Sequence, residues 1–153
     1  MSGKCILKKS VLIFFSSTDT IKCGTNQMNA GDNVMSIYLS KIDTALNDNL
    51  EKLNRICALK DNWDGYGAEP LPEHTITRAG ELIRKLRVQP EIFPTADGTI
   101  QIEYEKDNGD YLEFQFSGNG TCEVFRRMNG KEEYFNALDD YSSINALTEA
   151  FYG

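Results

Sequence analysis

Residues 99–136 read TIQIEYEKDNGDYLEFQFSGNGTCEVFRRMNGKEEYFN. Apolar and polar residues alternate through this stretch, so that Leu112, Phe114 and Phe116, for example, fall on one side of the chain. Successive side chains of a β-strand point to opposite faces, and a period of two therefore predicts strands with one buried face. This pattern sets the fold class, and the rest of the chain is interpreted around it.

Short glycine-containing reversals separate the alternating runs. Asn-Gly and Asp-Gly between such runs are the strongest local signal for a hairpin, because the favoured two-residue turns need positive φ angles. Strands joined by turns this short must be antiparallel neighbours. We expect a meander of four strands, and a fifth strand at Ile92 and Phe93 is an open alternative. The reversals are Asp97-Gly98, Asn108-Gly109, Gly118-Asn119-Gly120 and Asn129-Gly130.

Helical periodicity flanks the predicted meander. Residues 36–59 carry apolar side chains at spacings of three and four, which is typical of an amphipathic helix. A second helix is expected to start near Pro72, because proline fits the first helical turn. Residues 141–152 predict a short closing helix, with Asp139 or Asp140 as its N-cap.

These elements predict an α+β fold in two layers. One face of the meander is apolar and must be covered, and the helical stripes are the available cover. We expect two N-terminal helices and the short C-terminal helix to pack against an antiparallel sheet of four or five strands. The opposite face should then present polar side chains to water: Gln101, Glu103, Glu105, Glu113, Gln115 and Glu123.

The 153 residues fit one domain, but their first part differs from the rest. Residues 16–33 are rich in Ser, Thr, Asn and Gly, and such a stretch lacks the apolar surface that offsets ordering entropy. We therefore predict a mobile N-terminal extension over residues 1–34 and a single α+β domain over residues 35–153.

Charge and apolar runs limit the classes of partner. The chain has 16 Lys and Arg against 23 Asp and Glu, a net charge of −7, and this acidity opposes direct binding to nucleic acid. The apolar run at residues 11–15 is far shorter than the roughly 20 residues that a membrane helix needs. Neither nucleic acid nor a membrane is an expected partner.

The cysteines and the one histidine, His74, do not predict a metal site. No two of the four cysteines have CxxC spacing, which structural zinc sites usually show. No phosphate-binding or cofactor-binding motif is present either, so no metal and no cofactor is expected. Cys57 and Cys122 lie on predicted apolar faces and are expected to be buried thiols, which favours a reducing, cytoplasmic compartment.

The segment from Asp61 to Glu73, DNWDGYGAEPLPE, is the most distinctive part of the chain and has two interpretations. In the first it is an ordered connector between two helices, with the aromatic side chains at the edge of the core and Asp64 capping backbone donors. In the second it is the site of a small hydrolase or ligand-binding enzyme, since acid–base catalysis needs carboxyls in different environments. The candidate residues of this connector site are Trp63, Asp64, Tyr66, Glu69 and His74.

Two segments, residues 59–72 and 90–104, resemble a diffuse group of small uncharacterised bacterial proteins. The shared pattern is a Trp-Asp-Gly-x-Gly turn after a helix, then a helix, then Pro-x-x-x-Pro-Thr-x-x-Gly leading into alternating strands. The resemblance covers roughly residues 50–120. It implies an α+β fold in an accessory or mobile gene and implies no catalytic residue. The positions that carry it are Trp63, Asp64, Gly65, Gly67, Pro90, Pro94, Thr95, Asp97 and Gly98.

The functional hypothesis follows from the predicted acidic face. An acidic face without a chemical motif indicates a non-catalytic protein that binds a basic protein, because complementary charge speeds encounter and disfavours wrong partners. An antitoxin, an immunity protein or an inhibitor of a nuclease is the expected class. The sequence leaves the oligomeric state open. The expected contact residues are Glu103, Glu105, Glu113 and Glu123.

Overall fold

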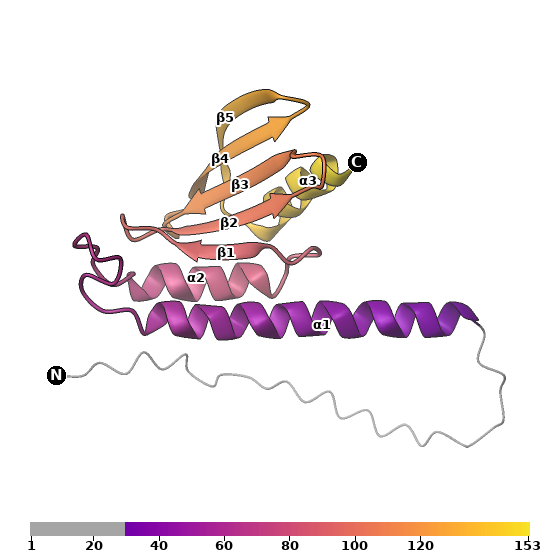
Figure 1. The fold of residues 1–153 in the computed structure, drawn as a ribbon, viewed down its shortest axis with the longest axis horizontal. Helices are drawn as coiled ribbons and strands as arrows, with labels where there is room; N and C mark the ends of the chain where they lie inside the picture. The colour runs from indigo at the N-terminus through magenta and orange to yellow at the C-terminus, as the bar shows by residue number, and fades with distance from the viewer. Residues whose placement is uncertain (1–29) are drawn as a thin grey trace, which may run out of the picture.

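The computed structural model describes residues 30–153 (Figure 1). Three helices and five strands make up the expected α+β fold. In chain order they are α1 (Ala30–Cys57), α2 (Glu73–Ile83), β1 (Glu91–Pro94), β2 (Ile100–Glu105), β3 (Tyr111–Phe116), β4 (Thr121–Met128), β5 (Lys131–Leu138) and α3 (Tyr141–Tyr152).

The first helix starts earlier than its apolar pattern predicted. α1 begins at Ala30, so positions 30–34, which the sequence analysis assigned to the extension, are helical. Once a helix is nucleated, each added residue gains one hydrogen bond, so a helix extends readily beyond its apolar stripe. The remainder of the predicted extension, residues 1–29, lies outside the described residues.

The sheet is a meander of five strands, which settles the alternative left open at Ile92. The strands lie in the order β1-β2-β3-β4-β5, and each pair of neighbours is antiparallel. The last hairpin shows why the turn sequence matters. Asn129 and Gly130 both have positive φ angles, 51° and 74°, as a two-residue turn of the favoured hand requires.

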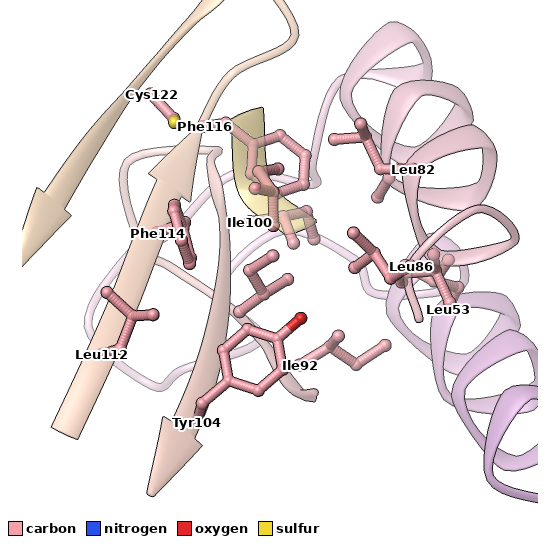
Figure 2. Close-up of a cluster of buried hydrophobic side chains, with 14 of the residues drawn as sticks. Leu53, Leu82, Leu86, Ile92, Ile100, Tyr104, Leu112, Phe114, Phe116 and Cys122 are labelled. Carbon is pink, nitrogen blue, oxygen red and sulfur yellow. The ribbon is translucent and has the colours of Figure 1, made fainter. Parts of the chain in front are cut away.

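The core lies between the sheet and the three helices. In Figure 1, α2 lies between α1 and β1, and α3 passes behind the strands. Leu53 of α1 and Leu82 of α2 face the apolar side of the sheet, where Ile100 and Phe116 meet them (Figure 2). Among residues 30–153 the helices cover only this side, and the other side of the sheet is left open by them.

The second helix ends before its apolar stripe does. α2 stops at Ile83, and the amide of Lys85 then donates to the carbonyl of Leu82 at 2.8 Å. Bonds of this i to i+3 type tighten the last turn and change the direction of the chain. Leu86 still reaches the core, so its predicted burial is right although it lies beyond the helix.

Two neighbouring aspartates join α3 to the rest of the fold. Asp140 is the N-cap, since its side chain accepts a hydrogen bond from the amide of Ser143 at 2.8 Å. Asp139 is only 2% exposed and accepts from Arg78 of α2 and from the amide of Gly120, both at 3.1 Å. The sequence left the choice of cap open, and the direction in which each side chain points decides it.

The cysteines differ from the expectation at one position. Cys122 is a buried free thiol, as expected. Cys57 is half-buried and disulfide-bonded, so the expectation of a free thiol there is wrong.

Among residues 30–153, none of the helices combines the length and the apolar character that crossing a membrane requires.

Candidate functional site

The open face of the sheet carries the glutamates that the alternation placed there. Residues 102, 104, 112, 114, 122 and 124 are buried, so the residues between them point to the opposite, uncovered side. Glu105 and Glu123 are exposed on this open face, and Glu103 and Glu113 are half-buried. The four side chains are therefore brought onto one surface, as predicted.

Three glutamates form a row across neighbouring strands. Glu103 of β2 pairs with Glu91 of β1 on one side and with Glu113 of β3 on the other. Like charges directly opposite each other destabilise a sheet. Two neighbours reduce this repulsion: Lys52 of α1 lies 3.3 Å from the carboxylate of Glu91, and the hydroxyl of Tyr111 donates to Glu113 at 2.9 Å. We call Glu91, Glu103 and Glu113 the glutamate row.

Tyr111 is held in its protonated form beside this row. Partial burial is the main cause that raises the pKa of its hydroxyl above the ordinary value, and the hydrogen bonds and negative charges of Glu113 and Glu103 raise it further. A tyrosine in this environment keeps its proton, donates a hydrogen bond to the carboxylates and does not add another negative charge.

Aromatic side chains occupy the other half of the open face, and the sequence analysis missed them. The ring of Phe125 lies between those of Tyr111 and Tyr134, with centroid distances of 5.9 Å and 4.8 Å. Tyr134 lies on the edge strand β5 and is 77% exposed. The sequence could have predicted this placement, because each aromatic residue lies an even number of positions from the outward polar residues of its strand.

A recess lies where the acidic and the aromatic halves meet. Its volume is about 320 Å³, and it lies over β3, β4 and β5. Charged, amide and aromatic side chains of the open face line it, together with parts of two residues whose side chains belong mainly to the covered face. The lining residues are Glu113, Gln115, Glu123, Val124, Phe125, Tyr134, Phe135 and Asn136.

The connector between α1 and α2 is a self-contained turn. The carboxylate of Asp64 accepts hydrogen bonds from the amides of Tyr66 at 2.8 Å and Ala68 at 3.0 Å. These bonds lower the pKa of Asp64, which is the opposite of what a general acid needs. The indole of Trp63 donates to the carbonyl of Glu69 at 3.1 Å. The expected capping role of Asp64 is confirmed.

The other connector candidates do not converge on Asp64. Tyr66 was expected at the edge of the core, and this is wrong, because its side chain is 95% exposed at the tip of the turn. Glu69 and His74 are also exposed, and His74 lies on α2 beside Gly118 of the β3–β4 turn. The arrangement brings together no acid–base pair, so no specific observation favours the hydrolase alternative.

Within residues 30–153, no group of three or more His, Cys, Asp or Glu side chains is placed to hold a metal ion. No family model, curated protein or solved structure matches the chain. The resemblance to small bacterial proteins therefore stays a prediction, and any function must be argued from the open face itself.

Proposed function

We propose that this chain is a non-catalytic accessory protein that binds a basic protein through the open face of its sheet. The observation that carries the proposal is the glutamate row, in which Glu91, Glu103 and Glu113 lie side by side on the sheet face that none of the three described helices covers. Glu105 and Glu123 extend the acidic surface on either side of the row.

The energetics of the row support a partner of opposite charge. A like-charge pair directly across two strands destabilises a sheet, whereas an opposite-charge pair stabilises it by about 0.2–1 kcal/mol, and Glu103 makes two like-charge pairs. A Lys or Arg side chain from a partner converts this repulsion into attraction. Binding then gains both the new ion pairs and the relief of the strain that the free protein carries.

The charge also suits rapid association. The net charge of −7 adds a long-range attraction to basic proteins, and complementary charge raises association rates at low salt. A toxin or nuclease with a basic groove is the partner class that best fits this surface. Masking such a groove blocks its access to nucleic acid, which gives an antitoxin-like, immunity-like or inhibitor-like role.

The test compares two variants of equal net charge. The first replaces Glu103, Glu105, Glu113 and Glu123 with lysine. The second makes the same replacement at exposed acids away from the open face: Asp43, Asp48, Asp61 and Glu69. Each tagged protein is used to capture partners from an extract of the native host at low salt and at increasing salt.

We expect the wild type and the second variant to recover the same basic protein in stoichiometric amount, and the first variant to lose it. Recovery should fall as salt rises, because exposed charges are screened beyond about 10 Å at 0.1 M salt. Equal recovery by the first variant and the wild type contradicts the proposal, and so does a captured partner that is itself acidic.

A further inference from the structure

We propose that the recess on the open face binds the guanidinium group of an arginine side chain supplied by the partner. This inference rests on the proposed function and names the chemical group that the face recognises. The recess, its two carboxylates (Glu123 exposed, Glu113 half-buried) and its aromatic wall carry the argument together, and the carboxylates alone would not define a site.

The register of the sheet builds the recess from two adjacent rows. In one row, Glu113, Phe125 and Tyr134 lie opposite one another on β3, β4 and β5. The next row holds Gln115, Glu123 and Asn136 on the same three strands. Each row forms one wall, and the volume of about 320 Å³ between them has room for an arginine side chain.

The carboxylates are placed to bridge one cation. Glu113 and Glu123 are diagonal neighbours across β3 and β4, a relation in which side chains start about 7–8 Å apart. A planar cation with donors on two edges fits between groups at this separation. The described residues give the carboxylate of Glu123 no hydrogen bond or ion pair, so it is available to a ligand.

The aromatic wall favours arginine over lysine. The rings of Phe125 and Tyr134 form a close, tilted pair, with an interplanar angle of 34° and centroids 4.8 Å apart. The high exposure of Tyr134 leaves its ring accessible for a further planar group. A guanidinium stacks on such a ring and presents five donors in one plane, whereas an ammonium is a strongly hydrated point charge.

The face already contains one contact of this kind. The guanidinium of Arg127 lies 5.9 Å from the centroid of the Tyr111 ring, at the other end of the aromatic row. This arginine donates from Nε to the carbonyl of Gly109 at 3.1 Å, so it is held away from the recess. None of the described residues that line the recess carries a positive charge.

The test uses two blocked basic peptides of equal charge, one with arginine at its centre and one with lysine there. Binding of each to the full chain is measured by calorimetry at low salt and by the NMR shifts of the recess residues. The arginine peptide should bind roughly three- to tenfold tighter, as expected for one cation–π contact in a partly open site. Its shifts should centre on Glu123 and Tyr134.

Variants assign the preference to the recess. Tyr134→Leu and Glu123→Gln should each remove most of the arginine preference, and Tyr134→Phe should keep it, because stacking needs the ring and not the hydroxyl. Tyr66→Leu is the matched control: it removes an exposed tyrosine from the connector and should change nothing. Circular dichroism checks that every variant is folded, which is expected since the altered side chains are exposed.

Three results overturn the inference: equal affinity of the wild type for both peptides, an unchanged preference in Tyr134→Leu, or no binding of either peptide. These results differ from a failure of the proposed function. If the host partner is lost by the charge-reversed face but both peptides bind equally, the acidic face functions without an arginine pocket. If the charge-reversed face still captures the partner, the proposed function fails as well.

Discussion

Glu103 and Glu113 lie directly opposite each other in the antiparallel register of β2 and β3. Glu91 continues the row on β1, so Glu103 has a like charge on each side. The row is not the arrangement that stability alone favours, because oppositely charged or β-branched pairs at these positions stabilise a sheet. This relationship links the stability of the fold to the proposed binding face.

Reversing the central charge of the row should stabilise the isolated protein. In Glu103→Lys, two repulsive pairs become attractive, and we expect the free energy of unfolding to rise by about 0.5–1 kcal/mol at low salt. Urea denaturation measures this change. Glu123→Lys is the control, since Glu123 pairs only with the neutral Gln115 and Asn136 and should show no comparable gain. An equal rise in the free energy of unfolding of both variants would mean that the lower net negative charge of the protein, and not the glutamate row, is responsible.

Removing the cation beside Asp139 should destabilise the fold. Arg78→Met leaves a carboxylate that is 2% exposed without its charged donor, and hydrogen bonds to charged groups typically contribute about 1.5–3 kcal/mol. Chemical denaturation should show a loss of this size. Arg55→Met removes an exposed arginine whose ion pair to Glu51 is 4.0 Å long, and it should change stability by less than about 0.5 kcal/mol. Similar losses in the two variants contradict this assignment.

The connector should loosen at low pH. Backbone hydrogen bonds lower the pKa of Asp64 below its ordinary 3.8, so its stabilisation is present above that pH and is lost as the pH falls through the folded value. Trp63, the only tryptophan, lies next to Asp64 and reports this step by its fluorescence.

A matched pair of variants tests this assignment. Asp64→Asn keeps an oxygen acceptor but cannot titrate, so the step in Trp63 emission should disappear. In Asp110→Asn the step should remain, although the pKa of Asp110 is also lowered, because that residue lies in the distant β2–β3 turn. A step that persists in Asp64→Asn assigns the acid sensitivity of the connector to another group.

The buried thiol should resist alkylation. Burial raises the pKa of Cys122 from 9.0 to about 11, and near pH 8 this change lowers its thiolate fraction about 100-fold. Iodoacetamide labelling followed by site-resolved mass spectrometry should therefore show little modification of Cys122 in the folded protein and ready modification in urea. Equal labelling rates in the two states would place the thiol at the surface.

The strands and turns could be predicted because local chemistry specifies them. The alternation around Phe114 and the Asn129-Gly130 turn each admit one local conformation, and both are as expected. The ends of the helices were predicted less accurately, because cooperative and long-range effects set them. The start of α1 at Ala30 and the end of α2 at Ile83 depend on helix propagation and on packing against the sheet, which no single residue encodes.

The same distinction between local and long-range effects applies to the candidate site. The outward direction of Glu103 and Glu113 follows from the alternation of side chains along their own strands. Tyr66 was misplaced because an aromatic side chain is usually a packing residue, and only the finished turn shows that no core lies within its reach. The face of the sheet on which Phe125 lies could have been predicted from the alternation in the sequence, but its contacts with the rings of Tyr111 and Tyr134 could not.

The sequence by itself determined the strands, their turns and the side of the sheet on which each side chain lies, because a period of two and positive-φ turns are local properties. Only the tertiary structure decided that three glutamates share one row and that the ring of Phe125 lies against that of Tyr134 beside Glu123. The physical reason is register: neighbours across strands are far apart in sequence, and the pairing of whole strands sets them.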